Sequence, residues 1–240
     1  MSIAPNKPGF TTLLVITRYP WWGFMFGFLS MAIFRLPLWR NDKLSFWRLM
    51  GSGKNGTFSL TPDLRQWAIL LVARPGQPGQ ALPAAQYTRQ LLGAFVAGWL
   101  KIFGRHTKAY LLQPEEGHGL WNGRQVFGPV PKQANFTGPV AVLTRASIKI
   151  TKLRRFWQHV GPVARQMASA PGFITSYGVG EVPFTKQATF SIWQSKAQMK
   201  AFAYQMQQHK EVVAKTRKEK WYSEDLFMRF SIIDEVETIH

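Results

Sequence analysis

The sequence contains no cysteine, and this absence excludes several kinds of chemistry at once. Disulfide bridges, thiolate metal sites, cysteine-held clusters and thiol nucleophiles are all ruled out, and a reducing, cytoplasmic location is the natural expectation. Familiar catalytic signatures are also missing, since the chain has no Walker loop, no H-E-x-x-H and no G-x-S-x-G. The stretch GSGKNG at 51–56 lacks the full spacing of a phosphate cradle, which favours a glycine-rich loop.

Acidic residues are scarce. Lys and Arg number 30 against 12 Asp and Glu, giving a formal net charge of +18, with basic clusters at Arg145–Arg155 and Lys210–Lys220. Such a field attracts nucleic acid or membrane phosphates, although it can also be a solubilising surface. No zinc-finger spacing, RNP-like strand or basic-region heptad accompanies the charge. We therefore rank an anionic membrane surface above nucleic acid as a partner.

Long apolar runs are missing as well. The candidate run, Trp21–Phe34, has 14 uncharged residues, fewer than the roughly 18 expected of a spanning helix, and it lacks the flanks of a secretory signal. Two interpretations stay open: a buried core helix, which the short length favours, or an aromatic segment that dips into a membrane interface. In the second, Trp21, Trp22 and Trp39 mark its edges, with Arg35 and Arg40 nearby. We expect at most a peripheral protein at the inner face of the membrane.

What the chain does contain indicates a folded protein with an internal repeat. It is 46% hydrophobic and includes ten Trp and eighteen Phe, enough for a large core or an apolar cavity. TTLLVITR at 11–18 matches GPVAVLTR at 138–145, and QWAILLV at 66–72 matches QATFSIW at 187–193. Near-constant offsets between these pairs favour a duplication.

Each half reads as strand, helix, two strands, helix and strand, the ferredoxin-like order. We assign residues 1–115 to an N-terminal ferredoxin-like half with an aromatic-rich insertion, 116–137 to a linker, and 138–240 to a C-terminal half. Two antiparallel sheets with helices on one face can bury their open faces against each other. The sequence therefore predicts an α+β protein in which both units form one barrel within the chain.

One histidine stands out. In the expected helix at 196–220, His209 lies on a stripe of otherwise inner-face residues, namely Met199, Phe202, Met206, Val213 and Thr216. It can be a neutral, hydrogen-bonded core residue, or it can ligate a metal. No second ligand lies one turn away on that face, which disfavours zinc and non-heme iron. Heme iron needs only one axial histidine, so both the core interpretation and heme ligation remain open.

Several spaced segments resemble the spheroidene monooxygenase family of carotenoid-biosynthetic enzymes. In the second half these are GPVAVLTRASIK at 138–149, GVGEVPFTKQATFSIW at 178–193 and MKAFAYQMQQHKEVVAKTRKEKWYSEDLFMRF at 199–230; in the first half, FWRLMGSG at 46–53 and QWAIL at 66–70. The resemblance implies heme-dependent oxygenation of a linear carotenoid at carbon 2, yielding a ketone. A Trp that ends a strand, followed by a His-bearing helix, also resembles dimeric α+β barrel heme proteins.

These resemblances imply roles for particular residues. His209 would be the proximal ligand of heme b iron and Trp193 a catalytic residue. Arg145, Lys149 and Arg217 are candidates for the heme propionates, although surface charge is the simpler explanation for any one of them. Dioxygen, an apolar polyene and an electron donor such as ferredoxin would be the partners. A heme carrier without turnover, or a ligand-free module that binds an anionic partner, remains an alternative. The oligomeric state stays open.

Overall fold

The computed structural model describes residues 10–54, 61–76, 82–205 and 219–237. In the N-terminal half, the strands are β1 (Thr12–Arg18), β2 (Leu44–Gly53), β3 (Pro62–Ala73) and β4 (His106–Gly119). Its helices are the short 3-10 turn η1 (Trp21–Gly23), α1 (Phe24–Ile33), α2 (Arg35–Trp39) and α3 (Ala84–Phe103).

The C-terminal half repeats this order. Its strands are β5 (Val140–Ile148), β6 (Phe173–Val182), β7 (Lys186–Trp193) and β8 (Tyr222–Glu237). Its helices are the 3-10 turn η4 (Ile150–Lys152), α4 (Leu153–Ala168) and α5 (Lys196–Gln205). The helix predicted to run to residue 220 is thus described as far as Gln205.

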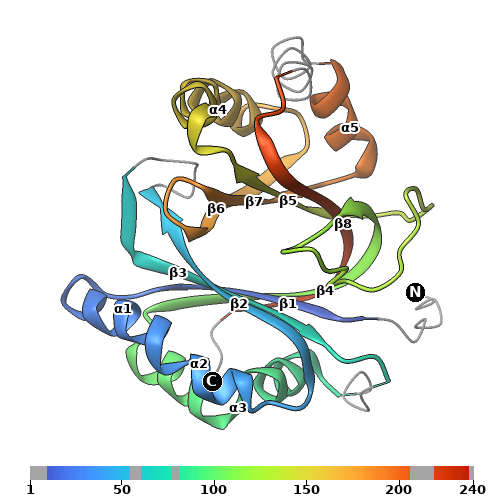
Figure 1. Cartoon of the computed structure of the whole chain (residues 1–240). Coiled ribbons are helices and arrows are strands. Elements are labelled where there is room, and N and C mark those ends of the chain that lie inside the picture. Colours follow the sequence, from blue (N-terminus) through green and yellow to red (C-terminus); the bar gives the residue numbers. More distant parts are fainter. Residues whose placement is uncertain (1–9, 55–60, 77–81, 206–218, 238–240) are drawn as a thin grey trace.

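All eight strands form one closed barrel in the order β1-β3-β2-β6-β7-β5-β8-β4. Each half contributes four neighbouring strands, and both halves use the ferredoxin-like order in which the first strand lies between the fourth and the third. Helices α1, α2 and α3 cover the outside of one half, while α4 and α5 cover the outside of the other (Figure 1). The predicted α+β barrel made of two tandem units is confirmed.

The barrel interior is filled by side chains from both halves and from the connection between them. Interior positions include Leu14 and Leu70 from the first half and Leu143 and Phe190 from the second. Trp121, Val126 and Phe127, from the segment predicted to be a linker, complete the same core, and Trp121 is fully buried. Strand β4 also runs to Gly119, past the domain boundary predicted at residue 115. The connection is therefore part of the fold's core.

The two seams between the halves differ in length. Strands β4 and β8 pair over 11 positions, whereas β2 and β6 pair only through Gly51 with Gly180 and Ser52 with Val179. The hydroxyl of Ser52 donates to the Gly178 carbonyl at 2.9 Å and accepts from the Gln66 side-chain amide at 2.8 Å. Gly51–Gly53 are part of β2, so the described start of the glycine-rich stretch is a strand end.

The aromatic segment at 21–39 is not an insertion and not a buried core helix. It forms η1, α1 and α2, which together occupy the place of the first helix of the N-terminal ferredoxin-like unit. Within the part of the chain described by the structure, Trp21–Trp39 is the helical stretch with the length and mean hydropathy (1.3) to cross a membrane, and only 28% of it is buried. The short length of the apolar run favoured a buried core helix, and this interpretation is wrong. In α1 the buried positions are small residues, and most of the large side chains are exposed.

Candidate active site

On the outer face of the C-terminal sheet, the described residues leave the middle of β5 uncovered, and we call this part of the surface the window. Near one end of β5, Phe156 of α4 packs against Ala146 and Ile148. Towards the other end, Val140 and Val142 pack with residues of α5. Thr144 lies between these two covered stretches and is exposed, although its strand is interior to the sheet. Its neighbours in register, Thr189 on β7 and Phe227 on β8, are partly exposed.

The apolar side of α4 is only partly covered by the barrel. The helix is strongly amphipathic, yet Leu153, Trp157, Val163 and Met167 on its apolar side are partly exposed. An amphipathic helix normally buries this stripe against the core. Next to it, an open groove of about 360 Å³ is lined by Leu153, Arg154, Trp157, Gln158 and Phe184. The incomplete burial of α4 and this groove leave apolar surface available to a large apolar ligand.

Trp193 anchors α5 to the end of β7. Its indole is buried, its Nε1 donates to the Ser191 hydroxyl at 3.0 Å, and its ring lies 5.2 Å from that of Phe202 and 5.5 Å from that of Phe173. Met199 packs in the same cluster. The stripe positions that fall within the described part of α5, Met199 and Phe202, are buried as predicted. Trp193 thus supports the base of the helix that leads towards the predicted ligand.

The predicted heme ligand, His209, and the predicted propionate partner Arg217 lie outside the described residues. Lys149 is exposed immediately after β5, where its backbone N–H donates to the Trp221 carbonyl at 2.9 Å. This position is at the α4 end of the uncovered window. The roles assigned to these three residues stay predictions.

Arg145 is buried inside the barrel, on the opposite face of β5 from Thr144. Its guanidinium donates to Glu181 at 3.0 Å, to Glu224 at 2.6 Å and to the side-chain oxygen of Asn122 at 3.1 Å, and lies 4.9 Å from the Trp121 ring centroid. All three of its nitrogens therefore have protein partners. Strand alternation places Arg145 on the face of Leu143. This placement argues against the predicted propionate role.

A buried ionic cluster borders the window on its β8 side. Glu116 has no exposed surface and accepts from Lys196 Nζ at 2.6 Å and from the guanidinium of Arg229. Arg229 pairs in register with Val142, so it lies on the outer face, and its guanidinium stacks over Phe227 at 4.6 Å. Among the described residues, its buried Nε has no hydrogen-bond partner. An orphaned donor of this kind suits an anionic group at the edge of the apolar surface.

The buried ionic cluster lowers the pKa of the Glu116 carboxyl. Burial raises the pKa of its carboxyl, but hydrogen bonds from Lys196, the Ala134 backbone N–H and Arg229, together with the charge of Arg229, outweigh burial and bring the pKa below its ordinary value. Glu116 and Arg229 are 113 positions apart in the sequence, so their pairing leaves no local sequence signal. In the described residues, no group of three or more His, Asp or Glu side chains could hold a metal ion.

The sequence of the chain is similar to sequences of known enzymes. A spheroidene monooxygenase from Rhodobacter capsulatus is 31% identical over 210 residues, covering 85% of this chain and 82% of that protein. The chain belongs to the spheroidene monooxygenase family. A second spheroidene monooxygenase, from Cereibacter sphaeroides, is 33% identical over 205 residues and covers 85% of this chain. The chain spans only 60% of that relative's length. No family model matches the chain.

Solved structures show that this spheroidene monooxygenase family member shares its fold with distant proteins. An aldoxime dehydratase in complex with butyraldoxime has a TM-score of 0.57 at 9% identity, covering 95% of this chain and 81% of that one. A second aldoxime dehydratase has a TM-score of 0.52 at 8% identity, covering 96% and 84%. At such low sequence identity, these matches show a similar fold and nothing about function.

Proposed function

We propose that this chain is a monooxygenase that uses heme b to introduce oxygen into a long apolar polyene, a linear carotenoid or a similar compound. Membership of the spheroidene monooxygenase family is the observation that carries the proposal. The uncovered window at Thr144, beside a half-buried apolar helix and an orphaned arginine donor, supports it as a place for a large, flat, apolar group with anionic edges.

Particular residues would hold the heme. His209 would bind its iron, and Arg229, Lys149 and Arg217 would pair with its propionates. Apolar side chains of α4 and α5, such as Val163 and Phe202, would exclude water from its faces. Bound heme would supply the activation of dioxygen, with electrons from a soluble donor such as ferredoxin. Trp193 would act by keeping α5 seated on β7, through its contacts with Ser191 and Phe202.

The polyene would lie in the groove beside α4. Leu153, Trp157 and Phe184 offer it apolar surface, and Trp157 and Phe184 meet edge to face with ring centroids 6.5 Å apart. Two successive hydroxylations at one carbon of the polyene would give a geminal diol, which would lose water to form a ketone. A cytoplasmic location at the inner face of the membrane suits a donor in solution and a substrate that dissolves in lipid.

Hemin titration of the purified protein tests the cofactor. We expect a Soret band whose position shifts, or which is lost, in His209→Ala. The matched control is His106→Ala, an exposed histidine at the start of β4, which should leave the spectrum unchanged. If His209→Ala binds hemin with the spectrum of the parent protein, the assignment of the ligand is wrong.

A bulky residue in the window tests the location of the site. Thr144→Phe should weaken hemin binding by about tenfold or more, because an added ring fills the space the ligand would need. Leu64→Phe, at an exposed position on β3 in the other half, is the control and should change neither affinity nor melting temperature. Product mass after incubation of a polyene with dioxygen and reduced ferredoxin then separates an oxygenase from a heme carrier, since a carrier forms no oxygenated product.

A further inference from the structure

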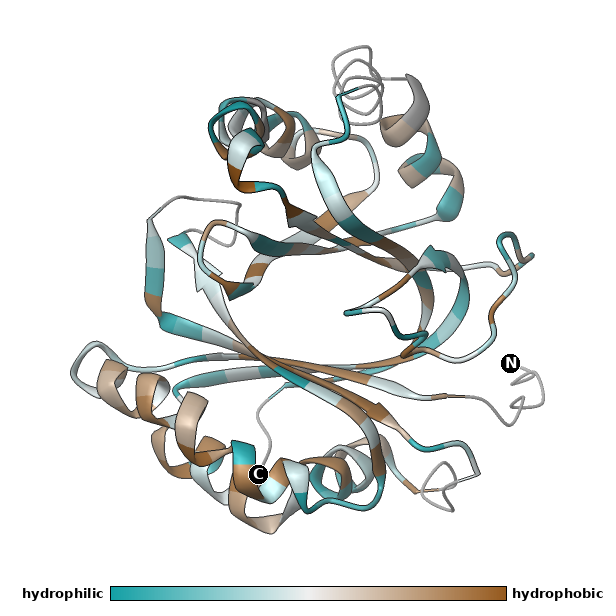
Figure 2. Cartoon of the chain, viewed as in Figure 1, coloured by the Kyte–Doolittle hydropathy of each residue, from teal (hydrophilic) through white to brown (hydrophobic). Residues whose placement is uncertain are grey.

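Large apolar side chains face outward along the whole of the 21–39 segment. Trp21 is 73% exposed and Trp39 is 72% exposed, and Trp22, Phe28, Leu29 and Leu36 between them are exposed too. In Figure 2 the ribbon of α1 is coloured as hydrophobic over most of its length, whereas the ribbons of α4 and α5 are mixed. Scattered exposed apolar residues are normal, but a contiguous patch of this kind marks an interaction surface.

The amphipathicity of α1 is the inverse of that expected for a helix facing water. Its buried positions are the small residues Gly27 and Ser30. A side chain at Gly27 would collide with Trp67 and Tyr19, and the Ser30 hydroxyl donates to the Gly27 carbonyl at 2.6 Å. At these two positions of α1 the inner side accepts only small residues, and most of the large side chains of the helix are exposed. Exposing the outer face of such a helix to water is unfavourable, and burying it in the apolar part of a membrane interface is favourable.

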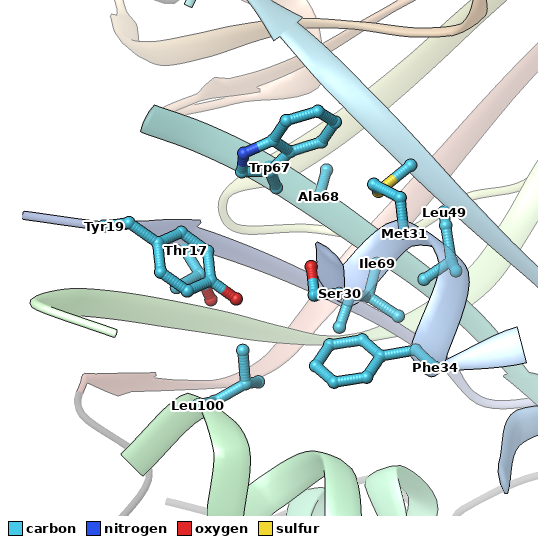
Figure 3. A pocket seen from close by; sticks show the side chains of 10 residues that line it. All are labelled: Thr17, Tyr19, Ser30, Met31, Phe34, Leu49, Trp67, Ala68, Ile69 and Leu100. Atoms are coloured by element: carbon cyan, nitrogen blue, oxygen red, sulfur yellow. The ribbon is translucent and has the colours of Figure 1, made fainter. Parts of the chain in front are cut away.

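The segment is firmly seated against the rest of the protein. Phe34 and Leu38 are buried, and the Phe34 ring meets that of Trp99 on α3 edge to face at 5.9 Å. Between α1 and the sheet there remains a cavity of only about 10 Å³, lined by residues such as Tyr19, Ser30 and Leu100 (Figure 3), room for about one water molecule. Spanning a bilayer would require the helix to leave this seat, so a position flat in the interface fits better.

The basic residues on this face favour an anionic lipid surface over a second copy of the chain as its binding partner. The helical segments Trp21–Trp39 and Ala84–Phe103 contain no Asp or Glu, while Arg35, Arg40 and Lys101 are exposed on or beside them. A second copy of the chain would bring the same basic residues and another +18 charge against this face. Anionic lipid headgroups are attracted by these cations, and exposed tryptophans at both ends of the segment suit the headgroup level.

We propose that the face formed by η1, α1, α2 and the neighbouring side of α3 docks on an anionic phospholipid bilayer, with α1 and α2 lying in its interface. Phe95 and Ile102 of α3 are exposed and extend the apolar surface. The proposal goes beyond the proposed function, because it rests on none of the residues assigned to the heme or the polyene. It can be tested separately, because α4 and α5 lie on the opposite side of the barrel (Figure 1) and docking leaves them facing the aqueous phase.

Vesicle flotation tests docking, using phosphatidylcholine vesicles with and without phosphatidylglycerol, at low and high salt. We expect flotation with anionic vesicles that weakens with salt. The triple variant Trp21→Ser, Phe28→Ser, Trp39→Ser should float about tenfold less or worse, with an unchanged melting temperature. The control Ile150→Ser, Ile174→Ser removes exposed apolar residues from the other half and should float normally.

Three results would overturn the docking proposal. One is a parent protein that floats with neither vesicle, and another is a triple variant that floats as well as the parent. The third is a concentration-dependent dimer in analytical ultracentrifugation that the triple variant abolishes, since the face would then bind a second copy. A parent protein that floats normally with anionic vesicles but binds no hemin would count against the proposed cofactor and leave docking intact.

Discussion

At the scale of single residues, Glu116 is the carboxylate at the centre of a buried ionic cluster. It is fully buried on β4 and accepts hydrogen bonds from cations on two other elements, Lys196 at the start of α5 and Arg229 on β8. Lys196 Nζ also donates to the Ala134 carbonyl at 2.6 Å, which ties the connection between the halves to the same carboxylate. Removing one member of such a buried set leaves the others with uncompensated charge.

We expect Glu116→Gln to lower the free energy of unfolding by about 3–5 kcal/mol at pH 7. Glu115→Gln keeps an oxygen that can accept from the Ser231 hydroxyl, and should cost less than about 1 kcal/mol. The pKa of Glu116 is lowered from 4.5 in the folded protein. The ionised carboxylate therefore makes its full contribution to the free energy of unfolding above pH 4.5, and this contribution is lost as the pH falls through the lower pKa of the folded protein. Urea denaturation should therefore show the gap between parent and Glu116→Gln narrowing below about pH 4.5. A gap that is constant with pH would contradict this account.

At the scale of elements, one glycine in α1 and one in α3 have opposite surroundings. A Cβ at Gly27 would lie 2.4 Å from Trp67 Nε1, whereas a Cβ at Gly98 in α3 has no neighbour within 4 Å. Gly27→Ala should destabilise the protein by about 1–3 kcal/mol through overpacking. Gly98→Ala should be neutral or stabilise it by up to about 1 kcal/mol, because Ala has the higher helix propensity. Thermal unfolding of both variants checks the pair, and equal effects would mean that α1 is not held as described.

The elements themselves could be largely predicted from sequence, because the two halves repeat the same strand and helix order and each strand shows local apolar patterning. Of the two interpretations left open for the apolar run, the one favoured by its short length, a buried core helix, was wrong. The spacing of its buried residues, Gly27, Ser30, Phe34 and Leu38 at intervals of 3, 4 and 4, was the available signal. A rule that looks for large apolar residues on the inner face overlooks a stripe that begins with glycine and serine.

The candidate site was harder to predict, for two physical reasons. Alternation along β5 places Arg145 with Leu143 and Thr144 with Val142, but both faces of this strand are apolar, so the sequence does not tell which face is interior. The ion pair of Glu116 with Arg229 joins strands that meet only when the barrel closes. Contacts made by closure leave no local pattern for sequence reasoning to detect.

At the scale of the whole molecule, the barrel is closed by one long seam and one short seam. Strands β4 and β8 join the halves over 11 pairs, while β2 and β6 join them over two. The interior core is shared by both halves and by Trp121 from their connection, so neither half buries its open sheet face without the other. Local opening should therefore begin where the fewest backbone hydrogen bonds hold the halves together, at the β2–β6 seam.

Native-state hydrogen exchange tests this order of opening. We expect amides of β4 and β8 to exchange only through global unfolding, and amides at the ends of β2 and β6 to exchange through a smaller local opening. Ser52→Ala removes the hydroxyl that bridges Gln66 and the Gly178 carbonyl across the short seam, and should lower protection there by about 1–2 kcal/mol. Ser45→Ala is the matched control, because its hydroxyl bonds to Val72 of β3 within one half. If Ser52→Ala lowers protection in β4 and β8 as much as in β2 and β6, the short seam is not an independent point of opening and the barrel opens only as a unit.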